Sequence, residues 1–177
     1  MDDRALVDAL RLGDPQAARA LVERFQGVVF CLCARMMGHR QDAEDVAQDV
    51  FLRAFRAIGG FDRERPLRPW LLGIAANRCR TALGRRARRP ALTEAAEQCV
   101  DHRPAVADPD DLAGELERAL ADLRSEYRLV FTLFHEQGLP YEEISAAIGR
   151  PVGTVKTWLH RARAELAERL SRRGVHC

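Results

Sequence analysis

LPYEEISAAIGRPVGTVKTWLHRARAEL, residues 139–166, is the stretch that decides the fold. Its first half places Ile144 and Ile148 at helical spacing, and Gly149 then supplies a sharp turn. Pro151 begins a second helix, because the missing N–H of proline costs nothing at the first helical position. The pattern predicts a helix-turn-helix.

The second helix of this motif has two different sides. Its inner side carries apolar residues, namely Val152, Val155, Leu159 and Ala162. Its outer side is neutral or basic and consists of Thr154, Lys156, Thr157, His160, Arg161 and Arg163. Residues 150–163 contain four bases and no acid, so this helix suits the major groove of DNA, where hydroxyls and long cations reach bases and phosphates. An ordinary surface hairpin of two helices is the alternative.

The rest of the chain also shows helical periodicity, without the sustained two-residue alternation of a strand. We therefore predict an all-α protein with two small helical domains. Helices are expected, among others, at residues 42–58 and 70–86, and residues 112–134 are expected to be helical. Between residues 90 and 111, prolines, acids and small residues replace the periodicity. The predicted organisation is domain 1–89, flexible acidic linker 90–112, domain 113–173 and tail 174–177.

The net charge of +2 conceals a strong pattern along the chain. Of the 28 basic residues, 27 are arginine and one is Lys156. The charge is −2 over residues 1–62, +8 over 63–89, −5 over 90–112 and +1 over 113–177. Near-neutrality therefore does not argue against a nucleic-acid partner.

Residues 63–89 carry nine bases and one acid, enough charge for several salt-sensitive phosphate contacts. Phe61 and Trp70 lie beside these cations, and an exposed aromatic ring gives an unstacked base a face to stack on. This favours nucleic-acid binding over a merely solvated helix face. Trp70 is equally compatible with a place in the core.

The predicted helix at 42–58 has a polar side beside its apolar stripe, made of Gln41, Asp45, Gln48, Asp49 and Leu52. Acids repel DNA phosphates, so this side suits a protein partner or solvent better than DNA. A protein-docking surface and plain solvent exposure both remain open on the residues alone.

Other functions find little support. The longest apolar run, residues 28–34, is too short to span a membrane, and the first residues lack a signal-peptide pattern, so we expect a cytoplasmic protein with reduced cysteines. Phosphate-binding loops, dinucleotide fingerprints and zinc spacings are missing from the sequence, so we expect no catalytic residue, no metal and no cofactor. Three cysteines are expected to be buried and inert: Cys31, Cys33 and Cys79. Cys99, His176 and Cys177 are the more exposed candidates for sensing.

Three segments in order resemble the signature segments of bacterial extracytoplasmic-function (ECF) sigma factors of RNA polymerase. They are DAEDVAQDVFLRAF (42–55), RPWLLGIAANRCR (68–80) and PYEEISAAIGRPVGTVKTWLHRARAEL (140–166). The resemblance implies the two domains that this family calls region 2 and region 4. It also implies a non-enzymatic subunit that binds core polymerase, selects promoters and helps to open DNA.

The resemblance assigns a role to each surface. Core polymerase would bind, through its clamp helices, Asp45, Gln48, Asp49 and Leu52. The minus-ten element would be recognised and melted by Phe61, Arg65, Arg68, Trp70, Asn77, Arg78, Arg80 and Arg85. The outer side of the second helix of the helix-turn-helix would recognise the minus-thirty-five element. Other faces of region 4 would meet the polymerase flap. The acidic linker would pass through a polymerase channel, and an anti-sigma factor would control the protein.

One position departs from the family pattern, because Trp158 stands where a basic residue is common. A tryptophan cannot make a cation's phosphate contact, although it can pack on the flap or on a thymine methyl group. Two other functions remain as alternatives: a stand-alone helix-turn-helix transcriptional regulator, which would dimerise on palindromic DNA, and a nucleic-acid-processing enzyme, for which catalytic residues are lacking.

Overall fold

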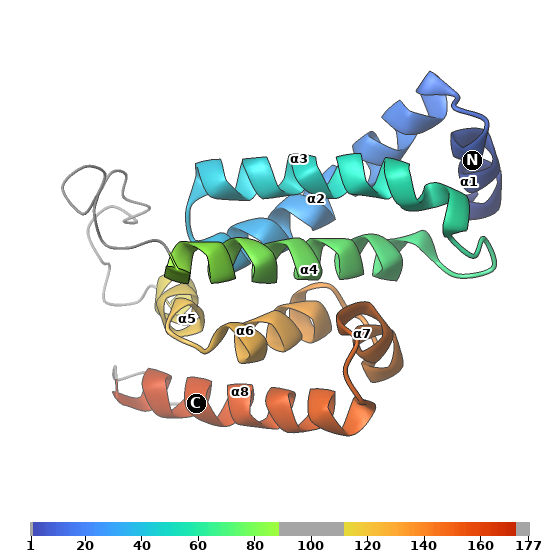
Figure 1. Cartoon of the computed structure of the whole chain (residues 1–177). Coiled ribbons are helices and arrows are strands. Elements are labelled where there is room, and N and C mark those ends of the chain that lie inside the picture. Colours follow the sequence, from blue (N-terminus) through green and yellow to red (C-terminus); the bar gives the residue numbers. More distant parts are fainter. Residues whose placement is uncertain (1, 89–111, 173–177) are drawn as a thin grey trace.

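The computed structural model describes residues 2–88 and 112–172, and within these ranges every regular element is a helix (Figure 1). The predicted all-α class is therefore confirmed. The predicted tail and all but the last residue of the predicted linker lie outside the described residues. The elements are α1 (Asp3–Arg11), α2 (Pro15–Met37), α3 (Arg40–Ala57), the 3-10 turn η1 (Ile58–Gly60), α4 (Leu67–Arg88), α5 (Leu112–Ala121), α6 (Ser125–Phe131), the π-helical turn η2 (Thr132–Glu136), α7 (Tyr141–Ile148) and α8 (Val152–Arg172).

The N-terminal helices begin and end at residues suited to helix termini. The carboxylate of Asp2 accepts the N–H of Ala5 at 2.8 Å and caps α1. Asp14 caps α2 in the same way, accepting from the N–H of Gln16 at 2.8 Å. Gly38 ends α2 in the left-handed conformation, with φ of 68°.

Helices α2, α3 and α4 pack together as the N-terminal unit, with α1 across one end (Figure 1). The apolar stripe predicted for residues 42–58 points into this unit, with five residues of α3 buried: Ala43, Ala47, Val50, Phe51 and Ala54. The start of α4 is held by α1, because Asp3 accepts the N–H of Leu67 at 3.1 Å. The N-terminal unit therefore presents the outer side of α3 to solvent or to partners.

Residues 112–134 are largely helical, as predicted, but they form more than one helix. The chain breaks between α5 and α6, where Arg124 takes an extended conformation with φ of −55° and ψ of 142°. Leu123 turns into the core at this break and is 4% exposed. Apolar residues continue at helical spacing across the break, and this hides it in the sequence. The bend lets both helices pack against α8.

The helix-turn-helix is formed by α7 and α8, as the sequence predicts. Gly149 has a φ of 65°, a left-handed conformation that favours glycine at this turn. The hydroxyl of Ser145 donates to the carbonyl oxygen of Arg150 at 2.6 Å and holds the turn. Pro151 directly precedes α8.

The two helical units are in direct contact. One continuous core of buried side chains runs from α1–α4 into α6, η2, α7 and α8. A second, smaller cluster is confined to the C-terminal unit, where α5 and α6 meet α8. Helices α4 and α7 approach each other closely, because a Cβ built on Gly73 would lie 3.0 Å from the carbonyl oxygen of Ala147. The fold therefore places one face of α4 against the helix-turn-helix.

Candidate nucleic-acid interface

The outer side of α8 is open to solvent. Val155, Leu159 and Ala162 are buried, so the opposite side of the helix presents Lys156, Thr157 and His160. Helical geometry brings these three exposed side chains to one face near the start of α8. This is the end of a recognition helix that contacts base edges in helix-turn-helix proteins.

The other predicted residues of α8 lie at the margins of that face. Arg161 donates to the hydroxyl of Tyr127 on α6 at 3.3 Å, and Arg163 donates to Nε2 of His135 on η2 at 3.2 Å. Thr154 is half-buried at the first turn of the helix. Burial, together with the charge of Arg163, lowers the pKa of His135, which keeps its imidazole neutral and able to accept this hydrogen bond.

Lys156 is held above an aromatic ring. Its Nζ lies 5.4 Å from the ring centroid of Tyr141, the first residue of α7. A cation over a ring is favoured electrostatically, so this contact limits the positions of the ammonium group. The lysine remains exposed and available to a phosphate or a base.

Trp158 is not on the reading face. This residue is half-buried and packs against both the continuous core and the smaller cluster of the C-terminal unit. The tryptophan that replaces a basic residue is therefore a packing residue, and it is not presented to a thymine methyl group in this arrangement.

The arginines of α4 differ in their solvent exposure and in their side-chain partners. Arg85 is exposed, and Arg80 is half-buried and donates to the side-chain oxygen of Asn77. The side chain of Arg78 is only 16% exposed and pairs with Asp49 of α3, with Nε 2.5 Å from the carboxylate. Arg78 thus joins α4 to α3, whereas Arg85 is open to solvent and Arg80 is held by Asn77.

The loop before α4 places its aromatic residues differently from the prediction. Phe61 is 5% exposed, and its ring packs on that of Trp70 with centroids 4.6 Å apart. Phe61 therefore belongs to the core in this arrangement and is not a free stacking platform. Trp70 is half-buried, which fits both roles that its sequence context left open.

A groove of about 480 Å³ lies between α4 and α7. One wall contains Arg65, Trp70 and Asn77, so the fold brings three of the predicted minus-ten residues together. The other wall contains Glu142 and Glu143 of α7. Arg68 also faces the C-terminal unit, since its Nη2 donates to the side-chain oxygen of Gln137 at 3.2 Å.

The predicted docking residues of α3 lie together on the outer side of that helix. Asp45 and Gln48 are exposed, and Leu52 is 48% exposed. Asp49 is half-buried and accepts from Arg53 at 3.3 Å in addition to its pairing with Arg78. Partial burial opposes ionisation of Asp49, but the hydrogen bonds and charges of these two arginines outweigh it and lower the pKa of the carboxyl group.

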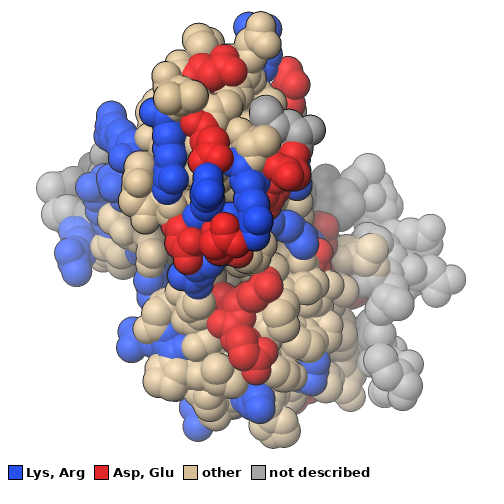
Figure 2. Space-filling model, turned by 90° about the vertical axis from the view of Figure 1, so that its right-hand side faces the viewer, with Lys and Arg blue, Asp and Glu red and all other residues tan. Residues whose placement is uncertain are grey.

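Charge is mixed on the end of the molecule where α1 and α7 lie. Figure 2 shows basic and acidic side chains alternating over the upper part of this face, with a group of acidic side chains below them. Ion pairs between α1 and the loop before α4 contribute to this mixture, because Arg4 pairs with Glu64 and Arg63 pairs with Asp8.

The cysteines divide into two kinds. Cys33 and Cys79 are fully buried, with their sulfur atoms 3.9 Å apart, as expected for inert core residues. Cys31 is exposed, so its predicted burial is wrong. Positions two apart on a helix point in nearly opposite directions, and Cys33 is the one that faces the core. Cys99, His176 and Cys177 lie outside the described residues.

Residues 2–88 and 112–172 contain no cluster of side chains suited to a metal ion. None of the helices in this part of the chain is long and apolar enough to cross a membrane.

Sequence reasoning missed the residues that join the two units. Arg35 of α2 pairs with Glu136 of η2 at 3.0 Å and with Glu117 of α5 at 3.6 Å. Arg35 and Glu136 are 101 positions apart, and nothing in a single sequence couples two such charged residues. The buried amide of Gln137 also carries no periodic signal, because it follows the π-helical turn.

The sequence of this chain matches two family models in the order of its two helical units. Residues 21–89 match Sigma-70 region 2, and residues 113–166 match Sigma-70, region 4. The ECF RNA polymerase sigma-E factor of Haemophilus influenzae is 35% identical over 182 residues, covering 96% of each chain. SigW of Bacillus subtilis, another ECF factor, is 32% identical and covers 93% of this chain and 94% of its own.

The chain belongs to the ECF sigma factors of the sigma-70 family. Members of this family are non-enzymatic transcription initiation factors, which agrees with the predicted lack of catalytic residues. Two solved structures resemble the whole chain. CnrH, in complex with the cytosolic domain of CnrY, has 31% identity and a TM-score of 0.70, covering 96% of this chain and 97% of its own. The sigma factor RpoE of Bartonella quintana, in complex with the anti-sigma factor NepR, has 25% identity and a TM-score of 0.72, covering 86% and 96%.

The boundaries of the matches agree with the helices. Region 2 begins within α2 and ends just after α4, and region 4 begins within α5 and ends within α8. In this ECF sigma factor the predicted docking and minus-ten residues thus belong to region 2, and the predicted minus-thirty-five residues belong to region 4.

Proposed function

We propose that this ECF sigma factor binds core RNA polymerase in the cytoplasm, directs it to promoters through their minus-ten and minus-thirty-five elements, and helps to open the DNA. The observation that carries the proposal is the presence of both modules in one chain, each with an accessible surface of the required chemistry. Region 4 offers the neutral and basic outer side of α8, and region 2 offers the arginines of α4 beside the acidic outer side of α3.

Core polymerase is proposed to bind the outer side of α3 through its clamp helices. Asp45 and Gln48 are free to contact a partner, and Leu52 adds an exposed apolar side chain of the kind that protein interfaces bury. Asp49 contributes charge at the margin of this surface, because two arginines of the chain itself already hold its carboxylate.

The minus-ten element is proposed to bind the accessible side of α4 and the loop before it. Arg65, Arg80 and Arg85 would contact phosphates, and Trp70 with Asn77 would hold a base that has left the stack. Flipping a base costs a few kcal/mol, so stacking and charge must return a comparable free energy. Phe61 supports the ring of Trp70 from the core, Arg78 positions α4 against α3, and Arg68 becomes available only when it leaves Gln137.

The minus-thirty-five element is proposed to bind the outer side of α8 as duplex DNA. Lys156, Thr157 and His160 would reach the major groove, and Arg161 with Arg163 would contact phosphates at its edges. Thr154 lies half-buried in the first turn of α8, beside this surface. The flap of the polymerase would meet other faces of region 4, and the acidic linker would occupy a polymerase channel.

Control by an anti-sigma factor is the remaining part of the proposal. The Bartonella quintana sigma factor, whose whole-chain arrangement is similar, was solved with its anti-sigma factor NepR. A protein of that kind would compete with polymerase or DNA for the same surfaces of region 2 and region 4.

Transcription with purified components tests this function. Core RNA polymerase without a sigma factor is mixed with the full chain, and holoenzyme formation is followed by gel filtration. Run-off transcription is then measured on a library of genomic fragments. We expect a stable complex and transcripts from a limited set of promoters. A chain that forms no complex and supports no transcript would rule the function out, whereas a dimer bound to palindromic duplex DNA would favour a stand-alone regulator.

A further inference from the structure

Side chains of α1 hold the loop that precedes α4. This loop consists of residues 61–66, and residues 62–66 are all exposed. We propose that α1 is a positioning element for promoter recognition: its contacts fix the shape of the loop, and this shape determines which bases region 2 selects. The inference rests on the proposed function of region 2. Helix α1 lies before residues 21–89, which match Sigma-70 region 2, and the proposed function gives it no role.

Arg11, the last residue of α1, holds the first end of the loop. Its Nη2 donates to the carbonyl oxygen of Phe61 at 2.5 Å, and its Nε donates to that of Ile58 at 3.4 Å. Hydrogen bonds from a charged donor are stronger than neutral ones. The ring of Phe61 packs on that of Trp70, with centroids 4.6 Å apart. Arg11 therefore also fixes the residue that supports this tryptophan.

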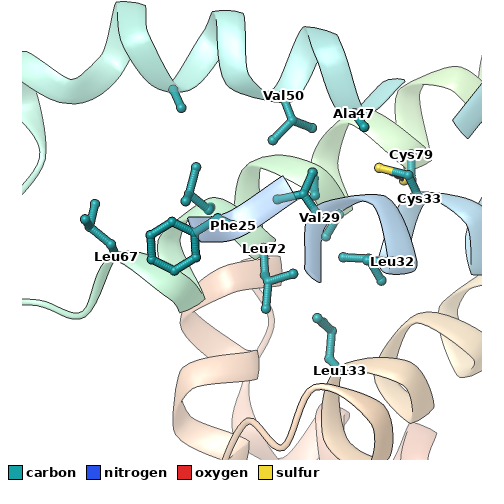
Figure 3. Close-up of a cluster of buried hydrophobic side chains, with 14 of the residues drawn as sticks. Phe25, Val29, Leu32, Cys33, Ala47, Val50, Leu67, Leu72, Cys79 and Leu133 are labelled. Carbon is teal, nitrogen blue, oxygen red and sulfur yellow. Dashed lines mark hydrogen bonds between the residues drawn. The ribbon is translucent and has the colours of Figure 1, made fainter. Parts of the chain in front are cut away.

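Asp3, the first residue of α1, holds the other end of the loop. Its carboxylate accepts the backbone N–H of Leu67, the first residue of α4, at 3.1 Å. The first N–H groups of a helix have no partner within it, so α1 completes this end of α4. The side chain of Leu67 is fully buried, and Figure 3 shows it in the core with Phe25 of α2. The start of α4 is therefore fixed both by α1 and by the core.

Two ion pairs join the middle of the loop to α1. Arg63 pairs with Asp8 at 2.8 Å, and Arg4 pairs with Glu64. About half or more of each of these four side chains is exposed, and exposed ion pairs contribute little stability. They restrict the middle of the loop, whereas the hydrogen bonds at its two ends carry most of the attachment.

Helix α1 is a rigid support because it is itself fixed to the core. Its three buried residues, Leu6, Val7 and Leu10, are at most 8% exposed. Asp3 and Arg11 are therefore presented to the loop from an anchored helix. A loop whose ends are fixed in this way loses less conformational entropy when it binds a base than a free loop does.

The attachment of the loop should affect base selectivity and electrostatic attraction differently. Phosphate contacts are independent of sequence and depend on the number of cations, which a loosened loop keeps. Selection of a base depends on where the contacting groups lie, and the loop and its ends place Arg65 and Trp70. Loss of the α1 contacts should therefore lower base selectivity without changing the salt dependence of DNA binding. A variant that merely unfolds in part would lower transcription from every template by the same factor.

Two positions test the two ends of the loop, and each has a matched variant. Arg11→Met removes the donors, and Arg19→Met makes the same substitution at an exposed arginine of α2. Asp3→Ala removes the acceptor for the N–H of Leu67, whereas Asp3→Asn loses the same charge and keeps a side-chain oxygen that can accept. Circular dichroism verifies folding. Hydrogen–deuterium exchange with mass spectrometry measures the mobility of peptides covering residues 58–68 in the full chain.

Base selectivity is measured on holoenzyme made with core RNA polymerase. The template is a promoter that the wild type transcribes from the library of genomic fragments, and each position of its minus-ten element is changed in turn to the other three bases. The selectivity ratio is the amount of transcript from the preferred base divided by that from the least preferred base. The salt dependence of holoenzyme binding is measured on the unchanged promoter.

We expect Arg11→Met and Asp3→Ala to increase deuterium uptake at residues 58–68. Both should lower the selectivity ratio by about fivefold or more, since one well-placed base contact provides discrimination of this size. Arg19→Met should behave as the wild type, and Asp3→Asn should retain most of the selectivity. The slope of log affinity against log salt should be the same in all four variants.

Four results would overturn the inference. They are unchanged deuterium uptake at residues 58–68, an unchanged selectivity ratio, equal selectivity in Asp3→Ala and Asp3→Asn, and a salt slope lowered by about 1 in Arg11→Met alone, which would make Arg11 a direct phosphate contact. If one of Arg11→Met and Asp3→Ala fails to fold, the other decides. A wild-type chain that forms no holoenzyme and no transcript removes the proposed function and this inference with it. Active holoenzyme with unchanged selectivity in the variants removes this inference alone.

Discussion

Asp49 connects the candidate polymerase face to the candidate DNA face. Its carboxylate accepts from Arg53 on its own helix and pairs with the largely buried Arg78 of α4. Replacing this aspartate would leave the Arg78 charge without its partner, at a cost of about 1–2 kcal/mol of stability. A variant at position 49 therefore perturbs the packing of α3 on α4 as well as any docking contact, and another residue is needed to test docking alone.

Leu52 provides that test. Its side chain is 48% exposed on the outer side of α3, so Leu52→Asp should leave the free energy of unfolding unchanged. The same variant should lower the affinity for core polymerase by about tenfold or more, as loss of an interface anchor does. Leu12, 88% exposed in the turn after α1, is the matched control. Affinity for fluorescently labelled core polymerase is measured for both variants. Equal affinity of Leu52→Asp and Leu12→Asp would remove α3 as the docking surface.

His135 gives a pH dependence with a defined sign. Burial and the charge of Arg163 lower its pKa in the folded chain, so the unfolded chain takes up a proton first as the pH falls. Stability from this contact is therefore complete above the unfolded pKa of about 6.5, and is lost as the pH falls from there toward the lowered folded value. Urea unfolding across this window should show a slope that His135→Gln reduces. His39→Gln changes a histidine outside this contact, and an identical slope in the two variants would contradict the assignment.

At the scale of elements, the two ends of α8 have different expected roles: its start is expected to contact DNA, and its last turn is not. Lys156 lies on the exposed face near its start, whereas Arg172 lies in its last turn and pairs with Glu168 at 2.6 Å. Lys156→Ala should lower the slope of log affinity against log salt for duplex DNA by about 1, because one phosphate contact is lost. Arg172→Ala should leave the slope unchanged. Affinities for a duplex of random sequence at several salt concentrations measure both, and equal slopes would place the lysine outside the interface.

The elements predicted well are those with a strong local signal. The apolar stripe of α3 and the glycine turn between α7 and α8 follow from neighbouring residues, and both are confirmed. The break between α5 and α6 was missed because Leu123 keeps the helical spacing of apolar residues while the backbone at Arg124 becomes extended. The spacing of apolar residues indicates which side of a helix is buried, but it does not indicate whether the helix is continuous.

The candidate site was predictable to the same extent. The outer side of α8 follows from its own buried stripe, so Lys156, Thr157 and His160 were placed by periodicity alone. The burial of Phe61 and the pairing of Arg78 depend on which helices become neighbours, and so does the role of Trp158 as a packing residue. Sequence spacing gives a residue's side on its own helix, whereas tertiary contacts decide whether that side is free.

For the whole molecule, the continuous core implies that the two units support each other. Buried residues of α2 and α4 form one cluster with those of η2, α7 and α8, and polar contacts of Arg35 and Arg68 join the same units. A chain of two independent domains would lack these contacts. Separation of the two units would therefore cost the free energy of these contacts.

The two tryptophans make this coupling measurable, because the chain has two, with Trp70 in region 2 and Trp158 in region 4. Both are half-buried, so the fluorescence of each changes when its own unit unfolds. Trp158→Phe leaves a reporter of the N-terminal unit, and Trp70→Phe leaves a reporter of the C-terminal unit. In each variant, urea unfolding is followed by fluorescence and by circular dichroism. We expect both signals to share one midpoint in each variant, as in a two-state transition.

Adding Glu136→Arg to each variant should separate the fluorescence midpoint from that of circular dichroism, because the broken ion pair lets each unit unfold alone. Separate midpoints before that change would show that the contacts between the two units contribute too little free energy to make them unfold together.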